Sequence, residues 1–242
     1  PEYKNNICLN CGVVFMYPHP AQKLLIQYYN SDYRQSETSL KLNNKIIDMP
    51  IQFPESAHSF LRFENMFHCI EKNASSINKL PSNKDTIIDI GGYQGMFLNA
   101  ANQAYGSKGI VVDFNKNGID FAKKTLGFKE SELINDVLDY KPKKKAKFVT
   151  MIHTLEHIHN PRKLLNHIKL KILKEDGYLY IEVPNLFGSA LSDPTHYFTY
   201  TIDSLKFLLN QTNFDIIDIY NAGNKHAPIT ISHDELVIIA LC

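Results

Sequence analysis

Apolar positions along this chain change their spacing at about residue 86. From there, short β-branched runs alternate with longer segments in which apolar residues recur every three to four positions, as strands and helices do. Strands separated by helices in this order predict a parallel sheet with crossover helices on its faces. The predicted strands are TIIDI, GIVVD, ELIN, KFVTMI and YLYIEV, and the predicted helices between them span residues 94–104, 117–126 and 161–173.

The helix predicted over residues 161–173 has the clearest boundaries. Asn160 can cap its first turn, Pro161 suits the first helical position, and Gly177 follows its end. Its apolar face predicts burial against the sheet. That face consists of Leu164, Leu165, Ile168, Ile172 and Leu173.

The two ends of the chain differ from this middle part. After YLYIEV comes a predicted helix over residues 201–213, and then the apolar runs FDIIDIY and ELVIIALC, with only a turn-rich stretch between them. Because no helix fits there, we expect these two runs to pair antiparallel at or near a sheet edge. Residues 1–80 are irregular, with a Cys-x-x-Cys-Gly knuckle, a helix-like AQKLLIQYYN and an amphipathic helix over 56–72. We interpret residues 1–80 as a small N-terminal cap and residues 81–242 as the main domain.

Composition narrows the class of protein. A chain of 242 residues that is 44% hydrophobic can bury a full core. A net charge of +1 argues against nucleic acid as the main partner. The apolar runs are far shorter than the roughly 20 residues of a membrane span, and the first residues lack a signal-peptide core. Four cysteines do not form a secreted disulfide framework. We therefore expect a cytoplasmic protein that binds neither membrane nor nucleic acid.

Three glycines, Gly91, Gly92 and Gly95, follow the first predicted strand. Ligands of open α/β sheets bind beyond the carboxyl ends of the strands, where glycine lets the backbone turn and approach them closely. The dinucleotide fingerprint G-x-G-x-x-G would need glycine where the chain has Tyr93 and Met96. A nicotinamide-dependent sugar enzyme is therefore a weakened hypothesis.

Acidic residues follow three successive predicted strands, at Asp89, Asp113 and Asp136. An acid at the position of Asp113 can accept both hydroxyls of a ribose. Three acids without a phosphate cradle suit S-adenosylmethionine, which carries hydroxyls, an exocyclic amine and a cationic ammonium. The alternative is an ordinary strand-to-helix turn whose acids are solvated.

These residues lie in stretches that make the chain resemble a class I S-adenosylmethionine-dependent methyltransferase, in particular the branch called methyltransferase domain type 23. The resemblance runs from about residue 85 to the end, in IIDIGGYQGMFL, VVDFNKNGIDFAKK, NDVLDY, FVTMIHTLEHIHNPRKLL, GYLYIEVPN and DPTHYFTYTIDSLKFLLNQTNFDI. It implies a Rossmann-like α/β fold: a seven-stranded, mostly parallel sheet with an antiparallel C-terminal hairpin, helices on both faces and a small N-terminal cap. The branch includes many bacterial enzymes of surface-polysaccharide and secondary metabolism.

The resemblance also implies the cofactor, S-adenosylmethionine, with S-adenosylhomocysteine as the product. In this family the residues that match the first motif hold the methionine part, the acid that matches Asp113 holds the ribose, and those that match Asp136 and Val137 border the adenine. The usual Gly-x-Gly pair is replaced here by Gly92-Tyr93. The residues expected to bind the cofactor are Asp89, Gly91, Gly92, Tyr93, Gly95, Asp113, Phe114, Asp136, Val137, Ile152 and His153.

The N-terminal stretch CLNCGVVFMYPHPAQKLLIQYYNSDY is similar to the second half of a zinc ribbon that often precedes this domain. Structural zinc needs about four ligands. Only Cys8 and Cys11 are visible, and a first pair would lie before Pro1. We therefore expect zinc only together with upstream ligands, and we assign no metal to the catalytic site.

Histidines are the candidate bases, because methyl transfer to a hydroxyl requires removal of its proton. His153 ends the strand KFVTMI, His157 lies four residues on, and His196 falls in the loop where substrate lids belong. We expect the catalytic base among His157, His196 and His153. If a helix begins near Thr154, His153 and His157 share a face. In the alternative, Glu156 and His157 pin the loop by hydrogen bonds, while His153 only borders the cofactor.

Other interpretations of these motifs carry less weight. HTLEH spells the inverted zinc-protease motif, but that motif needs a long helix and a distant third ligand. Metal-assisted methylation of an RNA terminal ribose, through Glu156, His157 and another histidine, lacks an obvious second glutamate. A domain of this fold that binds the nucleoside but has lost catalysis stays open as an interaction module. The run KPKKKAK predicts a solvated loop at the amino end of the sheet.

We therefore expect a methyltransferase that acts on a hydroxyl of a sugar or another small metabolite. Three aromatic residues lie beside His196 in the sequence, namely Tyr197, Phe198 and Tyr200. They either line the acceptor pocket or pack in the core. The sequence leaves open the acceptor, the choice of oxygen, nitrogen or carbon as the methylated atom, and a homodimer as the oligomeric state.

Overall fold

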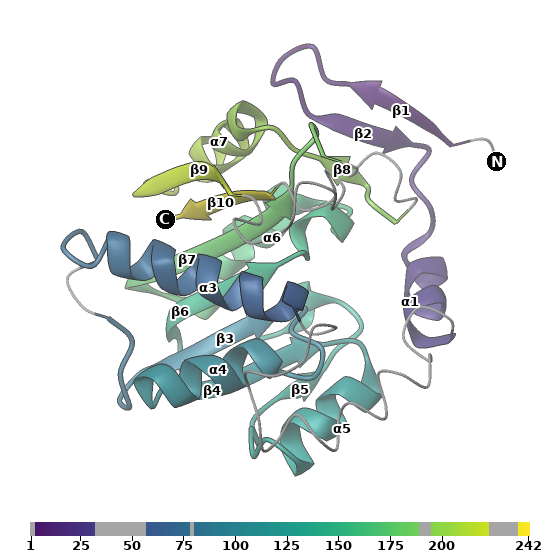
Figure 1. Ribbon diagram of the computed structural model, residues 1–242. Coiled ribbons are helices and arrows are strands. Elements are labelled where there is room, and N and C mark those ends of the chain that lie inside the picture. The colour runs from purple at the N-terminus through teal and green to yellow at the C-terminus, as the bar shows by residue number, and fades with distance from the viewer. Residues whose placement is uncertain (1–2, 32–56, 78–79, 189–194, 223–236) are drawn as a thin grey trace.

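Two sheets organise the computed structural model, which describes residues 3–31, 57–77, 80–188, 195–222 and 237–242. The large sheet has seven strands in the order β5-β4-β3-β6-β7-β10-β9, and a small sheet has the order β1-β2-β8 (Figure 1). The strands of the large sheet are β3 (Thr86–Ile90), β4 (Lys108–Asp113), β5 (Glu132–Leu133), β6 (Ala146–Ile152), β7 (Leu173–Pro184), β9 (Asp218–Ala222) and β10 (Val237–Leu241). Those of the small sheet are β1 (Lys4–Ile7), β2 (Val14–Tyr17) and β8 (Phe198–Thr199).

Strand directions follow from the connections. Strands β3 to β7 are parallel, and β10 pairs antiparallel with both β7 and β9. This confirms the predicted mostly parallel seven-stranded sheet with an antiparallel C-terminal hairpin. The turn-rich stretch between β9 and β10 lies outside the described residues.

Helices cover both faces of the large sheet. Helices α3 (Ala57–Lys72), α4 (Met96–Tyr105) and α5 (Lys116–Lys124) cover one face, and α6 (Pro161–His167) and α7 (Ile202–Gln211) cover the other. A further helix, α1 (Gln22–Ser31), lies near the turn after β5. As predicted, the Asn160 side chain caps α6 by accepting a hydrogen bond from the backbone N–H of Lys163. Helix α6 continues as a π-helical turn, Ile168–Ile172, and β7 begins at the next residue. Gly177 therefore lies inside β7 and does not end the helix, contrary to the sequence-based expectation.

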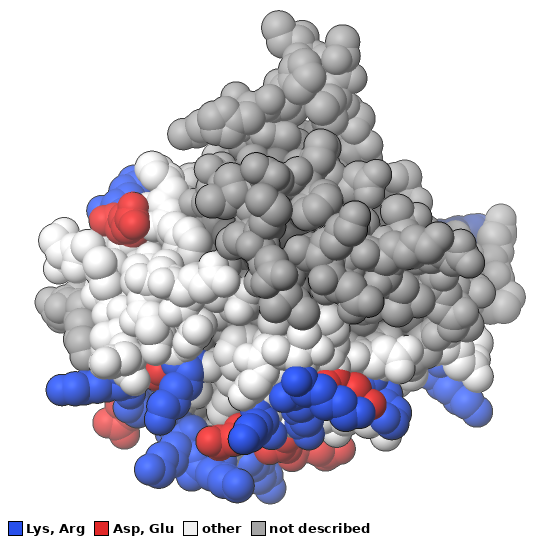
Figure 2. Space-filling view, turned by 60° about the horizontal axis from the view of Figure 1, so that its bottom comes forward, with Lys and Arg blue, Asp and Glu red and all other residues white. Residues whose placement is uncertain are grey.

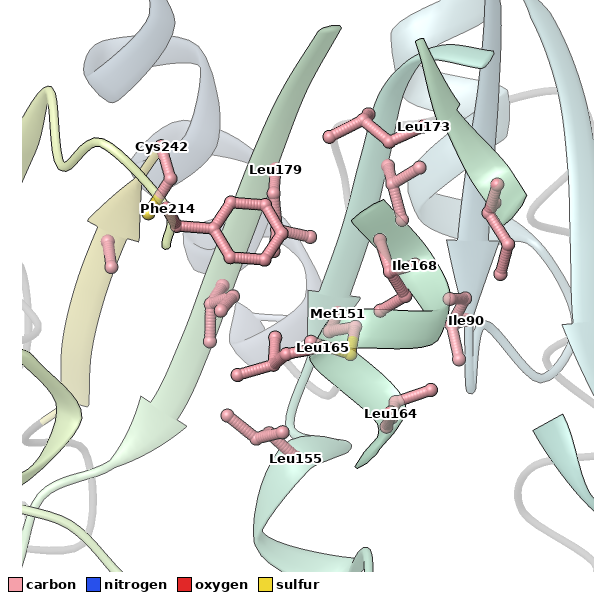
Figure 3. Close-up of a cluster of buried hydrophobic side chains, with 14 of the residues drawn as sticks. Ile90, Met151, Leu155, Leu164, Leu165, Ile168, Leu173, Leu179, Phe214 and Cys242 are labelled. Carbon is pink, nitrogen blue, oxygen red and sulfur yellow. The ribbon is translucent and has the colours of Figure 1, made fainter. Parts of the chain in front are cut away.

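The core has two layers because successive strand residues point to opposite faces of the sheet. Ile88 of β3 belongs to a cluster with Leu205 of α7 and with Leu164 and Leu165 of α6. Figure 3 shows Leu164 and Leu165 in this cluster. Its neighbour Ile87 faces the other cluster, which α3, α4 and α5 cover. Strands buried on both faces explain why these runs read as continuously apolar.

The N-terminal strands were not predicted. β2 pairs antiparallel with both β1 and β8, so that Val14 lies opposite Thr199 (Figure 1). The first residues of the chain are thereby joined to the segment that follows β7.

The bend after β3 needs glycine for reasons within the protein. Gly91 and Gly95 have φ angles of +77° and +76°, a region that side chains disfavour. A Cβ on Gly91 would lie 2.3 Å from Oγ1 of Thr154, and one on Gly92 would lie 2.4 Å from Oδ2 of Asp89. Contacts with the protein itself thus supply a reason for glycine, besides the ligand approach expected from the sequence.

A buried carboxylate, that of Asp89, lies beneath this bend. Asp89 is 2% exposed and accepts a hydrogen bond of 2.7 Å from the hydroxyl of Thr150. Burial raises the pKa of Asp89 to about 7, the nearby charge of Asp113 acts in the same direction, and the Thr150 hydrogen bond opposes them. Near neutral pH the carboxyl group of Asp89 is therefore partly protonated.

We expect Gly91→Ala to destabilise the fold by about 2–5 kcal/mol, as the sum of the positive-φ strain and of the collision with Thr154. Gly127→Ala is the matched control, because Gly127 also has φ +77° but a Cβ there would meet nothing within 4 Å. The control should lose only about 1–2 kcal/mol. Urea unfolding of both variants measures the difference, and equal losses would show that Thr154 moves aside without cost.

Asp89→Asn should change how stability depends on pH. The native pKa of about 7 lies above the ordinary value of about 3.9, so between these values the native state binds more protons than the unfolded chain. The free energy of unfolding of the wild type should therefore fall as pH rises from about 4 to 7, by up to about 1.4 kcal/mol per pH unit relative to Asp89→Asn. Urea unfolding at several pH values measures both curves.

Asp120→Asn on α5 is the control for this comparison. A hydrogen bond from Lys116 lowers the pKa of Asp120, so this group does not share the raised pKa of Asp89. Its curve should run parallel to that of the wild type. If the Asp89→Asn curve is also parallel, Asp89 does not titrate in this range.

Candidate functional site

The candidate site lies at the carboxyl ends of three neighbouring strands, β4, β3 and β6. The glycine bend follows β3, Asp113 ends β4, and Ile152 ends β6. Gly91 is exposed at this edge, whereas Phe114 and Ile152 are half-buried. The sheet thus brings together most of the residues that the sequence predicted for cofactor binding.

Asp113 joins two loops at this edge. It is 7% exposed, and its two carboxylate oxygens accept hydrogen bonds from the backbone N–H groups of Tyr93 at 2.8 Å and Asn115 at 2.7 Å. A carboxylate can accept about four hydrogen bonds, so these two are compatible with further ones from ribose hydroxyls. Gly118 of α5 lies directly under Tyr93, since a Cβ there would be 2.8 Å from the Tyr93 carbonyl. The Gly92-Tyr93 pair is thus accommodated by a glycine that the sequence did not single out.

Asp136 begins the turn after β5. Its side chain caps a short 3₁₀ helix, Val137–Asp139, by accepting a hydrogen bond of 2.9 Å from the N–H of Leu138. Val137 is half-buried next to it. The amide of Gln22, in α1, donates to the backbone carbonyl of Asn135 at 3.3 Å, so the N-terminal segment reaches this turn. An adenine contact of Asp136 and Val137 stays a prediction.

The residues at this edge fit a cationic nucleoside. Asp89 and Asp113 lie close enough for the charge of one to raise the pKa of the other. Two neighbouring carboxylates favour a ligand that brings positive charge, such as a sulfonium with an ammonium group. Phe114 and Val137 add half-buried apolar surface for an adenine ring. The donor set therefore suits S-adenosylmethionine and not a phosphate-bearing cofactor.

Three histidines and one glutamate lie close together at the turn that follows β6, and one of them, His196, comes from the segment after β7. His153 has a φ angle of +49°, and a 3₁₀ helix, Leu155–His157, begins two residues later. The Oε1 atom of Glu156 lies 3.7 Å from Nδ1 of His153 and 3.7 Å from Nε2 of His157. The ring of His196 lies 4.9 Å from that of His157, centroid to centroid. The structure thus brings together all three histidines that the sequence predicted as candidate bases.

Hydrogen bonds fix the orientation of His157. Its Nδ1 atom lies 2.9 Å from the carbonyl oxygen of Thr195. The backbone N–H of Tyr197 donates to the carbonyl of Glu156 at 2.8 Å. The segment that carries His196 is therefore tied to the turn that carries His157.

Glu182 is a member of the site that sequence reasoning missed. It is 1% exposed in β7, and its Oε1 atom lies 3.2 Å from Nε2 of His153. The hydroxyl of Tyr180 donates to its other oxygen at 3.1 Å, and its backbone carbonyl accepts from the N–H of His153 at 2.9 Å. The signal was an acidic residue in the middle of the apolar run YLYIEV, where no charge is expected without a partner.

The N-terminal segment packs against the same part of the molecule. The carbonyl of Pro20 lies 2.9 Å from Nε2 of His159 and accepts a hydrogen bond of 3.1 Å from the hydroxyl of Tyr197. The ring of His19 contacts those of His159 and Tyr197, and burial lowers the pKa of His19. Tyr197 and Tyr200 are buried, so these two aromatic side chains pack in the core.

The knuckle cysteines lie at the turn between β1 and β2. The Gly12 N–H donates to the carbonyl of Cys8 at 2.8 Å, and hydrogen bonds from the local backbone, first from Asn10, lower the pKa of Cys8. Among the residues that the structure describes, no third metal-ligating side chain joins Cys8 and Cys11. Zinc at this knuckle stays a prediction that needs ligands from elsewhere.

Surface charge is mixed. The lysines of KPKKKAK that precede β6 are exposed, at the amino end of the sheet and away from the site. In Figure 2, basic and acidic side chains lie intermixed along the lower edge of the described surface. In the part of the chain that the structure describes, every helix is too short or too polar to cross a lipid bilayer.

Comparisons with known structures show the same fold. Magnesium protoporphyrin IX methyltransferase from Synechocystis with bound S-adenosylhomocysteine aligns with 91% of this chain and 98% of its own, with a TM-score of 0.60 and 14% identity. An S-adenosylmethionine-dependent methyltransferase from Clostridium acetobutylicum aligns with 85% of this chain and 97% of its own, with a TM-score of 0.55 and 13% identity. At such identities the likeness concerns the fold.

The comparison with protein families gives the classification. Curated protein sequences give no significant match to the chain. The sequence profile of the methyltransferase domain family, type 23, matches residues 61–219, which is more than half of the chain, and S-adenosylmethionine is the cofactor of this class. The chain therefore belongs to the methyltransferase domain family of type 23 and is a class I S-adenosylmethionine-dependent methyltransferase.

Proposed function

We propose that this methyltransferase acts on a hydroxyl group of a small molecule, such as a sugar or another metabolite. The observation that carries the proposal is the group of Glu156, His157 and His196 beside the cofactor edge. A hydroxyl must lose its proton to become a good nucleophile, and histidines held by carboxylates and backbone carbonyls suit that step. An amine that is already uncharged would be nucleophilic without such a group.

The residues of the chain divide into two roles in this proposal. When bound, S-adenosylmethionine supplies a methyl group on a sulfonium sulfur. Asp113 and the bend from Gly91 to Gly95 hold the cofactor on one side of the edge. On the other side, His157 and His196 face the acceptor hydroxyl. The hydrogen bond between Nδ1 of His157 and the Thr195 carbonyl makes Nδ1 the donor, so that Nε2 is the nitrogen with a lone pair.

His153 takes a positioning role. Both of its ring nitrogens are turned to buried carboxylates, with Nε2 3.2 Å from Glu182 and Nδ1 3.7 Å from Glu156. A ring engaged in this way holds the turn after β6 in place, which keeps Glu156 and His157 near the cofactor edge. We therefore place the direct contact with the acceptor at His157 and His196.

The N-terminal cap completes the acceptor side in this proposal. β2 pairs with β8 directly after His196, and Pro20 binds both His159 and Tyr197. We propose that residues 1–80 shape the acceptor pocket, while residues 81–242 form the cofactor-binding domain. The acceptor is then selected by a surface that two distant parts of the chain build together.

We expect Asp113→Asn to weaken S-adenosylhomocysteine binding at least tenfold, because an amide accepts fewer hydrogen bonds than a carboxylate and carries no charge. Asp139→Asn, at an exposed acid of the neighbouring turn, is the control and should bind as the wild type does. Isothermal titration gives both affinities. Wild-type protein should be stabilised against heat by S-adenosylhomocysteine and not by NAD. Unchanged affinity in Asp113→Asn would contradict the assigned ribose contact.

We expect His157→Ala and His196→Ala each to slow turnover by about a hundredfold or more, which is the usual contribution of a group that activates a hydroxyl. Turnover is measured as S-adenosylhomocysteine release with a panel of sugars, nucleotide-sugars and phenols. His167→Gln, on the far end of α6, is the control and should keep the wild-type rate. Unchanged rates in both His157→Ala and His196→Ala would show that neither residue is the base. Cofactor binding without turnover on any acceptor would favour a binding module.

A further inference from the structure

We infer that Glu156, His157 and His196 form a binding site for a divalent transition-metal ion, which holds the acceptor hydroxyl. The chemical part of this inference rests on the proposed function, whereas the binding site itself does not. From the sequence, a metal at Glu156, His157 and another histidine was weighed only for methylation of an RNA ribose and was set aside, because no second glutamate was found.

The distances suit ligands of a single ion. One ligand atom from each of the three side chains lies within 4.8 Å of the other two. Ligands at about 2.0–2.2 Å from a tetrahedral ion are about 3.4 Å apart. The separation of 3.7 Å between Oε1 of Glu156 and Nε2 of His157 is close to that value and too long for a hydrogen bond. Closing the largest separation from 4.8 Å to about 3.4 Å needs a shift of about 1.4 Å, mainly of the half-buried His196.

Hydrogen bonds to the backbone orient the proposed ligands. A metal-binding histidine usually donates its other ring N–H to a carbonyl or carboxylate, which fixes the lone pair on the nitrogen that faces the ion. His157 has this arrangement, because Nδ1 binds the Thr195 carbonyl at 2.9 Å and Nε2 faces Glu156. Tyr197 N–H binds the Glu156 carbonyl at 2.8 Å. Residues on both sides of His196 therefore hold it against the two other ligands.

The charge balance favours a cation at this place. Glu156 is 1% exposed, and burying an ionised carboxylate costs several kcal/mol unless positive charge lies near it. His153 also lies close, but its Nε2 atom is directed at a second buried carboxylate, Glu182, at 3.2 Å. A divalent ion between Glu156 and His157 would bring positive charge next to this buried carboxylate, at the side where His157 Nε2 lies 3.7 Å away.

The ligand set indicates the kind of ion. Two imidazoles and one carboxylate suit Zn²⁺, Mn²⁺, Fe²⁺ or Co²⁺, whereas Mg²⁺ and Ca²⁺ prefer oxygen ligands alone. Three protein ligands leave a coordination position for another group, which is typical of catalytic sites and not of structural ones. We place the acceptor hydroxyl at that position.

An ion there would perform the activation that His157 would otherwise perform as a base. A hydroxyl bound to such an ion loses its proton more easily, and the proton passes to solvent water. The oxygen then attacks the methyl carbon of the cofactor. The carbon–sulfur bond breaks with its electron pair going to sulfur, which gives a methylated acceptor and neutral S-adenosylhomocysteine.

The test measures metal binding in a Cys8→Ser, Cys11→Ser background, in which the knuckle thiols cannot bind the ion. After treatment with EDTA and desalting, Zn²⁺ is titrated by calorimetry and Co²⁺ by visible absorption. We expect one ion per chain, with nitrogen and oxygen ligation and no thiolate charge-transfer band. Glu156→Gln and His196→Ala should each weaken binding at least tenfold, and His167→Gln should bind as the parent does. Stabilisation by S-adenosylhomocysteine shows that each variant is folded.

Failure of this inference is distinct from failure of the proposed function. Absence of stoichiometric binding, or binding that Glu156→Gln and His196→Ala leave unchanged, overturns the metal site, even if the enzyme methylates hydroxyls. For an acceptor found in the panel, EDTA should abolish turnover, and Zn²⁺ or Co²⁺ should restore it. Full turnover in EDTA would instead show that His157 activates the hydroxyl as a base. Metal binding in a protein that transfers no methyl group would instead retain the site and remove the proposed function.

Discussion

The contact between Thr154 and the bend after β3 is the constraint on which the site depends. The hydroxyl of Thr154 donates to the carbonyl of Ile90 at 3.0 Å, and it occupies the place where a side chain on Gly91 would lie. The bend belongs to the cofactor side, and Thr154 begins the turn that carries Glu156 and His157. In the proposed function, this contact between two strand ends sets the distance from the cofactor to His157, and methyl transfer requires that distance to be controlled closely.

Much of the fold could be predicted from local patterns. The parallel strands and the helices between them appear in the apolar spacing, because both faces of these strands are buried and each helix has one apolar face. Asn160 and Pro161 marked the start of α6 correctly, since capping is decided by neighbouring residues. The hairpin β1–β2 and its pairing with β8 were missed, because strands of two to four residues carry little periodicity and their partners lie at opposite ends of the chain.

The site was predictable where a single strand end carries the residues. His153, Glu156 and His157 are close in sequence, and the strand before them was clear. His196 lies beside His157, and Glu182 beside His153, because β7 and the segment after it come back to the same edge of the sheet. Spacing along the sequence does not predict such contacts between distant segments. The sequence also did not explain why glycine is needed at Gly91 and Gly92. Their pattern indicated that side chains are excluded there, but it could not tell whether a ligand or the protein itself excludes them.

The N-terminal segment gives this edge a second dependence on distant residues. Pro20 binds Tyr197, and Met16 donates its N–H to the Tyr197 carbonyl at 3.0 Å, so the position of His196 depends on residues near the start of the chain. Hydrogen bonds of this kind each contribute only about 1 kcal/mol, and several together are needed to fix a loop. The same loop carries Thr195, which orients His157. A change in the N-terminal segment should therefore alter the positions of both His157 and His196. In the proposed function, selection of the acceptor and activation of its hydroxyl are therefore coupled through one short segment, residues 195–199.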